Sequence, residues 1–99
     1  MKRTRPVPNY FAETLRESLE ECGKTQKDVA EATGIPSPHL SELKTGKRRC
    51  TVEHDLRLSR FFSMTPGLWT RLQLDYEFET AKHKLSASIE KQVKPLEAA

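Results

Sequence analysis

The stretch that most constrains the fold is residues 25–49, which read TQKDVAEATGIPSPHLSELKTGKRR. Thr25 can cap a helix with its hydroxyl oxygen, and Asp28 three positions later completes a capping-box pattern. Gly34 follows, and glycine commonly ends a helix. These signals predict a short helix over Gln26–Thr33.

A second helix should begin soon after the turn. A serine hydroxyl can accept hydrogen bonds from the free N–H groups at a helix start, and a proline in the first turn has no N–H of its own to leave unpaired. Ser37 and Pro38 therefore predict the start of this helix, and Gly46 predicts its end. The two helices and the turn can share one apolar contact through Val29, Ala30, Ile35, Leu40 and Leu43. Such a unit fits the major groove of DNA, with an ordinary helical hairpin as the alternative.

Several positions in this stretch form a wider pattern, namely Thr25-Gln26, Ala30, Gly34-Ile35, Leu40-Ser41, Leu43 and Gly46-Lys47-Arg48. The pattern resembles the helix-turn-helix of phage repressor (Xre/Cro) proteins. The resemblance implies an all-α, lambda-repressor-like domain of five helices. It also implies that the loop after the second motif helix lies along the sugar–phosphate backbone of DNA.

Base contacts are expected from the outward side chains of the second motif helix, and the candidates are Ser37, Pro38, His39 and Glu42. A glutamate can accept a hydrogen bond from the amino group of cytosine, and one good base contact contributes roughly 1–3 kcal/mol of discrimination. An ion pair with a nearby lysine or arginine is the alternative for Glu42.

Phosphate contacts are expected on either side of these base contacts. Gln26 occupies the position at which such folds hold a phosphate with a side chain and a helix N-terminus. The basic run after the helix supplies cations that fix register without reading sequence. The candidates are Thr25, Gln26, Ser41, Lys44, Thr45, Lys47, Arg48 and Arg49.

Length and charge agree with a small nucleic-acid-binding domain. A chain of 99 residues with 35% hydrophobic content has no room for a cleft lined by a second lobe, which argues against an enzyme. No acid–base pair or metal cluster supports a nuclease. The formal charge is +3, and Lys and Arg outnumber Asp and Glu by 10 to 7 in residues 1–50 but not in residues 51–99. This excess favours a polyanion partner.

No cofactor or membrane contact is expected. Cys22 and Cys50 are too few and too far apart for a zinc site, and His54 and His83 lack partners at ligand spacing. No apolar run is long enough for a signal peptide or a membrane span. We therefore expect a cytoplasmic protein with free thiols, in which Cys22 is a small buried hydrophobe.

Residues 1–10 are predicted to form an extended basic arm, because Pro6 and Pro8 disfavour a helix. The cations of this arm are Lys2, Arg3 and Arg5. The arm could reach a phosphate or a minor groove, and a solvated terminus is the alternative.

The first helix is predicted over Phe11–Cys22, with an inward face made of Ala12, Leu15, Leu19 and Cys22. The side chains expected toward solvent are Arg16, Glu17, Glu20 and Glu21. This acidic face would repel DNA, so it either serves another partner or is simply solvated.

A fourth helix is predicted over Thr51–Phe62, with Thr51 as its cap. The side chains expected in the core are Val52, Leu56, Phe61 and Phe62.

A fifth helix is predicted from Pro66 to about Ala81 or beyond, with two apolar faces. A domain this small can cover only one, so we expect the other to form a dimer. The interface candidates are Leu68, Trp69, Leu72, Leu74, Tyr76 and Phe78. Such a dimer places two recognition helices about 34 Å apart and predicts a palindromic operator. A cofactor pocket around Trp69 and Tyr76 is the alternative.

A second pattern runs beyond the motif through Arg5-Pro6, Leu15, Leu56-Arg57-Leu58, Thr65-Pro66, Trp69, Leu72-Gln73, Tyr76 and Ala81. It resembles the HigA class of antitoxins, which carry P-x-x-W-x-x-L-Q-x-x-Y after the same motif, although Asp55 replaces a common alanine. The resemblance implies a dimer that binds a small basic HigB-type ribonuclease toxin of the RelE kind and represses their shared operon. A phage or stand-alone repressor and a protein-interaction adaptor without DNA binding are the alternatives.

Residues 82–99 are polar, yet Leu85, Ile89 and Val93 recur every fourth residue before Pro95. This segment is either a last helix or a frayed tail outside a domain of residues 11–81. Its apolar stripe is narrow, so its order should depend on the dimer or a partner.

Overall fold

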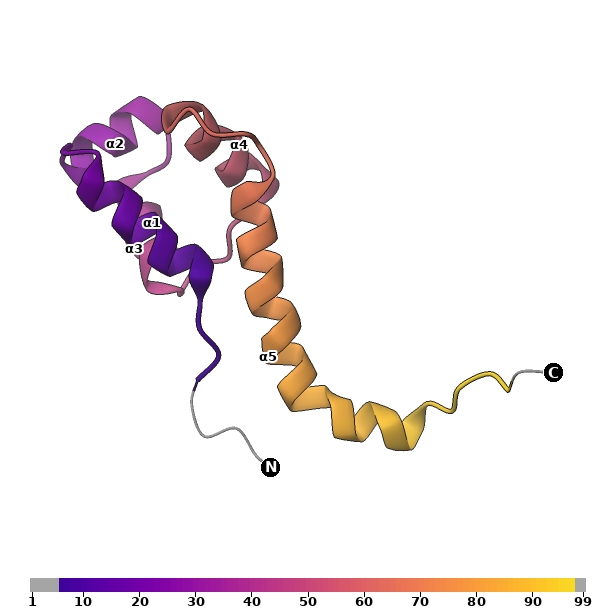
Figure 1. The fold of residues 1–99 in the computed structure, drawn as a ribbon. Coiled ribbons are helices and arrows are strands. Elements are labelled where there is room, and N and C mark those ends of the chain that lie inside the picture. The colour runs from indigo at the N-terminus through magenta and orange to yellow at the C-terminus, as the bar shows by residue number, and fades with distance from the viewer. Residues whose placement is uncertain (1–5, 98–99) are drawn as a thin grey trace.

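The computed structural model describes residues 6–97 and contains, within that range, five α-helices and no β-strand (Figure 1). This confirms the predicted all-α, five-helix fold. The helices are α1 (Tyr10–Glu21), α2 (Gln26–Thr33), α3 (Ser37–Thr45), α4 (Val52–Phe61) and α5 (Leu68–Gln92). Three cations of the predicted arm lie outside the described residues, namely Lys2, Arg3 and Arg5.

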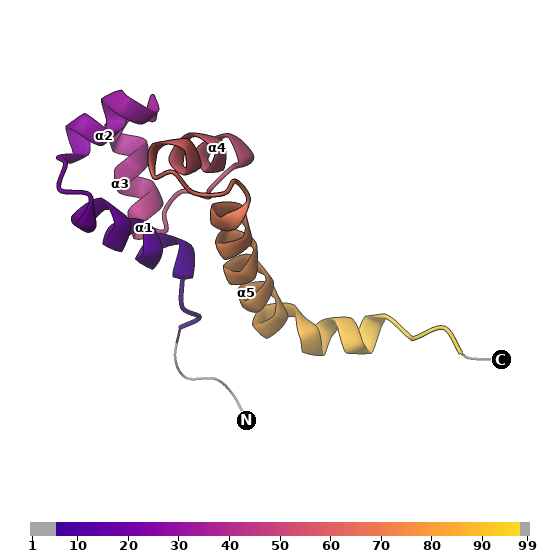
Figure 2. The ribbon, with the colours of Figure 1, turned by 45° about the horizontal axis from the view of Figure 1, so that its top comes forward.

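One hydrophobic core joins the first four helices with the first half of α5. Figures 1 and 2 show these helices gathered together from two directions. Its buried side chains are Phe11, Leu15, Val29, Ile35, Leu40, Leu43, Cys50, Leu58 and Trp69. The Trp69 ring meets Phe11 edge-on with centroids 5.8 Å apart, and its centroid lies 5.9 Å from that of Phe62. Because buried aromatic rings contribute large apolar areas, these contacts anchor the first turn of α5 to α1 and to the end of α4.

Side chains cap the first two helices, and the cap of α2 is the one that the sequence predicts. Thr25 Oγ1 accepts a hydrogen bond from the Asp28 N–H at 3.1 Å. Asn9 Oδ1 accepts one from the Ala12 N–H at 3.1 Å, so α1 begins at Tyr10 and not, as predicted, at Phe11. Gly34 ends α2 in the left-handed region with a φ of 76°.

The start of α3 differs from the prediction in one detail. Pro36, not Ser37, occupies the N-cap, and no side chain caps this helix. Ser37 is itself the first residue of the helix, and its hydroxyl accepts a hydrogen bond from Gln26 Nε2 at 3.0 Å. Pro38 lies in the first turn and Gly46 ends the helix with a φ of 80°, as predicted.

The inward face of α4 was predicted wrongly in part. Val52 and Leu56 are 68% and 52% exposed, whereas Asp55, Leu58 and Ser59 are buried. Those three positions, spaced by three and four residues, form the face that packs against α5 and the core. Val52 and Leu56 consequently point toward solvent.

Asp55 is buried because it caps α5 from a distance. Its carboxylate accepts hydrogen bonds from the N–H groups of Gly67 at 3.0 Å and Thr70 at 2.8 Å and from the Ser59 hydroxyl at 2.9 Å. Burial acts to raise the pKa of Asp55, but these hydrogen bonds outweigh it and hold the pKa below its ordinary value. The helix therefore begins at Leu68 and not, as predicted, at Pro66.

α5 continues without a break past Ala81 to Gln92, so residues 82–92 are helical and residues 94–97 are not. Figures 1 and 2 show this distal part bending away from the other helices. Every residue from Ala81 to Glu97 is exposed, including the apolar stripe of Leu85 and Ile89. Within the described range, no helix combines the length and apolar character needed to cross a membrane.

Candidate nucleic-acid interface

α2 and α3 are locked together by the predicted apolar contact. Val29, Ile35, Leu40 and Leu43 are at most 2% exposed, and Ala30 is half-buried. Such close packing leaves little freedom for the angle between the two helices. The outer face of α3 is therefore presented in one orientation.

A polar contact adds to this link. Gln26, the first residue of α2, donates through Nε2 to the Ser37 carbonyl at 3.0 Å, to the Ser37 hydroxyl at 3.0 Å and to the Ser41 hydroxyl at 2.7 Å. The structure thus brings three predicted site residues together. The Gln26 amide is already used within the protein, so it donates to a phosphate only by giving up one of these hydrogen bonds.

Glu42 forms the ion pair that the sequence left as its alternative role. Arg48 Nη2 lies 2.8 Å from Glu42 Oε1, and Arg48 Nε donates to the same oxygen at 2.9 Å. Pro38 is exposed, while Ser37 and His39 are half-buried on the same helix. The base-reading candidates therefore stand beside a paired carboxylate and guanidinium, not beside an isolated negative charge.

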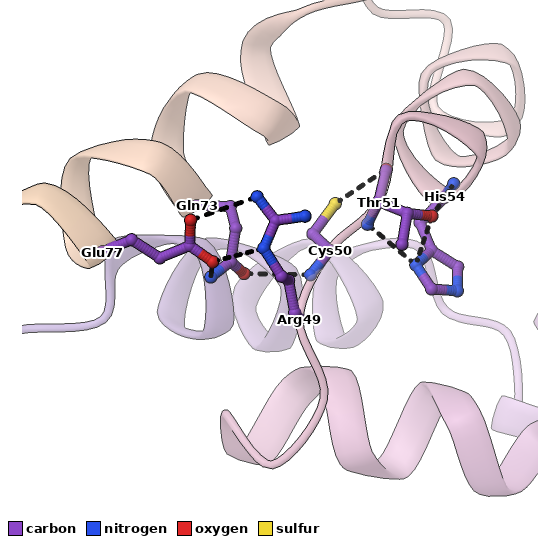
Figure 3. A network of polar contacts seen from close by, with 6 residues as sticks. All are labelled: Arg49, Cys50, Thr51, His54, Gln73 and Glu77. Atoms are coloured by element: carbon purple, nitrogen blue, oxygen red, sulfur yellow. Dashed lines mark hydrogen bonds and ion pairs between the residues drawn. The ribbon is translucent and has the colours of Figure 1, made fainter.

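The basic loop folds back onto the end of α3. The N–H groups of Lys47 and Arg48 donate to the Glu42 carbonyl at 2.9 and 3.2 Å. Arg49 points to α5, where its Nε donates to Glu77 Oε2 at 2.5 Å (Figure 3). Within residues 6–97, Lys47 is the member of this run whose side chain makes no ion pair.

Among the remaining phosphate candidates, two threonine side chains hydrogen-bond to the backbone of their own helices and one lysine does not. Thr25 is committed to its cap on α2, and the Thr45 hydroxyl donates to the carbonyls of Ser41 and Glu42 at 3.0 and 3.2 Å. Lys44 is half-buried at the end of α3. Of these, Lys44 retains a cationic side chain suited to a phosphate.

Sequence reasoning missed two further cations near this surface. A hollow of about 330 Å³ is lined by Arg16, Leu19, Glu20, Lys24, Gln26 and Lys44. Arg16 donates to the Lys44 carbonyl at 2.5 Å and so holds the end of α3 against α1. No local pattern announces this contact, because the two residues are 28 positions apart.

The predicted dimer residues fall into two groups. Leu68, Leu74 and Phe78 are 40%, 58% and 64% exposed, whereas Leu72 and Tyr76 are half-buried. Including Trp69 was wrong, because its ring is completely buried between Phe11 and Phe62 in the core of its own chain. The predicted interface residues that stay exposed on α5 are therefore Leu68, Leu74 and Phe78.

The alternative of a cofactor pocket around Trp69 and Tyr76 lacks a shared cavity. Tyr76 lines a hollow of about 380 Å³ together with Val7, Pro8, Tyr10, Asp75 and Glu79. Trp69 does not line that hollow, and its Nε1 is buried without a hydrogen-bond partner among the described residues. Trp69 therefore belongs to the core and Tyr76 to a surface hollow, and the two do not form one pocket.

His54 and Cys50 have structural surroundings instead of ligand-binding ones. His54 Nδ1 accepts a hydrogen bond from the Thr51 N–H at 3.1 Å, completing a capping box for α4. Burial, followed by the charges of Arg48 and His39, holds the pKa of His54 below its ordinary value.

The two cysteines differ in exposure. Burial raises the pKa of the Cys50 thiol to about 12, so it stays protonated and unreactive. Cys22, expected to be buried, is half-buried.

Comparison with known proteins agrees with this architecture. The helix-turn-helix family model HTH_3 matches residues 15–69, more than half of the chain. The uncharacterized HTH-type transcriptional regulator YddM of Escherichia coli K12 is 30% identical over 74 residues, covering 75% of this chain and 79% of that protein.

Two solved structures match nearly the whole chain. The Pseudomonas aeruginosa antitoxin HigA with higBA promoter is 28% identical, with a TM-score of 0.83 over 94% of this chain and 100% of that one. An addiction module antidote protein of a HigA family from Coxiella burnetii is 27% identical, with a TM-score of 0.80 over 93% and 100%.

Proposed function

Since the chain belongs to the HTH_3 helix-turn-helix family, we propose that it is an antitoxin that binds operator DNA as a dimer, represses its own operon and neutralises a small ribonuclease toxin. One observation carries the proposal. The structure with a TM-score of 0.83 to this chain is an antitoxin solved with promoter DNA. The rigid packing of α3 on α2 gives the present chain a recognition helix of the same kind.

The proposed base-reading surface consists of Ser37, Pro38, His39 and the Glu42–Arg48 pair. Because Glu42 and Arg48 are 2.8 Å apart, they would meet the groove as one unit that offers an acceptor and several donors. The pairing also removes the repulsion that an isolated carboxylate would suffer near phosphates. Removing one partner alone therefore leaves the other charge unbalanced at the DNA surface.

The proposed phosphate contacts are made by Lys44, by Lys47 and by the polar surface around Gln26. Lys47 is exposed, and its side chain makes no ion pair within the described residues, so it can reach a phosphate without breaking a contact. Each such contact contributes about 0.9 to the slope of log affinity against log salt.

A band shift on the DNA upstream of the gene tests operator binding. Lys47→Ala should weaken binding and lower the salt slope by about 0.9. Lys84→Ala, which changes an exposed lysine on the distal part of α5, is the matched control and should leave both unchanged. If the unchanged protein fails to shift the fragment, the adaptor alternative replaces the repressor.

Dimerisation through α5 is proposed from its exposed apolar stripe. Leu74, Phe78, Leu85 and Ile89 are all between 48% and 64% exposed, an arrangement that a second copy of the helix would cover. Sedimentation equilibrium should give a dimer for the unchanged chain and a monomer for Phe78→Glu. Leu56→Glu, at the exposed position on α4, should remain a dimer.

Toxin binding is the finer part of the proposal and is supported by the likeness to HigA-family antitoxins. Glu13, Glu17, Glu20 and Glu21 are exposed on α1, a surface that complements a basic partner and repels DNA. Co-expression with the small basic protein encoded beside this gene should relieve its growth arrest. Replacing all four by Gln should abolish the rescue but not the operator band shift.

A stand-alone repressor is the second candidate, favoured by the likeness to a protein named only as a transcriptional regulator. Affinity purification from native cells separates the two. Recovery of a small basic protein that arrests growth when expressed alone supports the antitoxin, whereas a shifted operator with no such partner supports the stand-alone repressor.

A further inference from the structure

A chain of hydrogen bonds joins α5 to the loop that follows the recognition helix (Figure 3). Gln73, 5% exposed, lies on α5 four residues before Glu77. Its Oε1 accepts a hydrogen bond from the Cys50 N–H at 3.0 Å, and its Nε2 donates to Glu77 Oε2 at 3.1 Å. One buried side chain thus holds the backbone of the loop and orients a carboxylate.

Glu77 in turn holds Arg49. The guanidinium donates through Nε at 2.5 Å and through Nη2 at 3.1 Å to the two carboxylate oxygens. This two-point contact fixes direction as well as distance. The hydrogen bond from Arg49 also holds the pKa of Glu77 below its ordinary value, so the carboxylate stays ionised near neutral pH.

The loop held in this way is short and connects two functional elements. Residues 46–51 lead from the end of α3 to the cap of α4, and Thr51 is both the neighbour of Cys50 and that cap. Fixing Arg49 and Cys50 on α5 therefore fixes the end of the recognition helix relative to α5.

We infer that Gln73 and Glu77 are positioning residues that set the recognition helix relative to the dimerisation helix, and that Arg49 serves this link and not a DNA phosphate. The inference rests on the proposed function as a DNA-binding dimer. In a dimer built through α5, the angle between α3 and α5 in each copy determines the separation of the two recognition helices. A looser link would let that separation vary.

The geometry favours this role for Arg49 over a phosphate contact. A phosphate would have to compete with a carboxylate that already meets two guanidinium nitrogens and is itself oriented by Gln73. Lys47, two residues earlier, reaches a phosphate without that competition.

The first test compares two DNA fragments, one carrying the natural operator and one with a single base pair inserted between its half-sites. The unchanged protein should lose about tenfold or more in affinity on the lengthened site. Arg49→Ala should discriminate between the two by no more than about threefold, with an unchanged salt slope. Lys47→Ala should keep the full discrimination and lose about 0.9 of the slope.

The second test exchanges the charges. Arg49→Glu and Glu77→Arg should each reduce discrimination between the two fragments, and the double variant should restore it because the ion pair is rebuilt in reverse. Glu79→Gln, two residues along α5 from Glu77, is the control and should discriminate as the unchanged protein does. Circular dichroism checks that each variant is folded.

The outcomes separate this inference from the proposed function. If the unchanged protein does not bind the operator, both fail. If it binds, and Arg49→Ala loses affinity equally on both fragments together with about 0.9 of the salt slope, Arg49 is a phosphate contact. In that case the positioning role is refuted while the repressor stands.

Discussion

The two halves of α5 are parts of one continuous helix, yet they are stabilised for different reasons. The first half places Trp69 and Gln73 inside the core and begins at a capped N-terminus. From Ala81 to Gln92 every residue is exposed. An isolated helical segment of this length is marginal in water. The first half is ordered by burial in the core of its own chain, whereas the second half continues that helix into solvent and would be covered by the proposed dimer contact.

The largest expected effect comes from the same Leu→Ala substitution made at a buried position and at an exposed one. Leu40→Ala, in the core, should lower the free energy of unfolding by about 3–5 kcal/mol, because the deletion leaves a cavity. Leu85→Ala, 49% exposed, should change it by no more than about 0.5 kcal/mol. Urea unfolding at protein concentrations low enough for monomers measures both. Leu40 lies on α3, in the core that the first half of α5 joins, so equal losses would show that the distal half of α5 is packed as tightly as that core.

The cap provided by Asp55 should come next in size. Asp55→Ala removes an acceptor of buried hydrogen bonds and should cost about 2–4 kcal/mol of unfolding free energy. Asp75→Ala, at an exposed position of α5, is the control and should fall within about 0.5 kcal/mol of the unchanged protein.

Acid titration sharpens this prediction. Because the pKa of folded Asp55 lies below its ordinary value of 3.8, its contribution is complete above that pH and is lost as the pH falls through the folded pKa. The stability of Asp55→Ala should therefore fall less steeply below pH 3.8 than that of the unchanged protein. Parallel curves would show that Asp55 is not the cap in solution.

A smaller effect is expected at the capping box of α4. Thr51→Ala should cost about 1 kcal/mol of unfolding free energy, as loss of a helix cap does. Since the pKa of folded His54 lies below 6.5, the unfolded chain binds more protons and stability should decrease as the pH falls below 6.5. His54→Glu keeps the cap with a carboxylate, so thermal unfolding between pH 7 and pH 5 should lose this step.

The smallest effect on the single chain is expected from deleting residues 82–99. Because every described residue of this part, 82–97, is exposed, the monomer should lose no more than about 0.5 kcal/mol. The same deletion should abolish the dimer in sedimentation and weaken operator binding. A deletion variant that stays dimeric would place the interface on the first half of α5.

The sequence predicted most accurately what short-range signals control. Thr25, Gly34 and Gly46 act within one helical turn, and the ends of α2 and α3 follow from them. The inward face of α4 was assigned in part to the wrong residues because Leu56 and Leu58 are both apolar, and only the neighbouring α5 determines which is buried. The start of α5 depends on Asp55, 12 residues before Gly67, a distance that no local pattern reports.

The candidate site shows the same division. The positions of Ser37, His39 and Glu42 on the second motif helix follow from its period. The contacts of the basic run cannot be predicted in this way, because the partner of Arg49 lies 28 residues away on another helix. One signal for this contact is present in the sequence, because Gln73 is a polar residue beside the apolar Trp69, Leu72 and Tyr76. A buried amide there must find hydrogen-bond partners in a neighbouring element.

The distant cap of α5 also has a mechanical consequence. α5 has 25 residues and packs on the other helices through its first half, so its full length acts as a lever of at most about 37 Å. A tilt of about 5° at the Asp55 junction displaces its far end by up to about 3 Å, close to the 3.4 Å rise per base pair along the axis of DNA. The stiffness of the few hydrogen bonds at that junction would therefore determine whether the recognition helices of two joined copies keep the spacing of one turn of DNA.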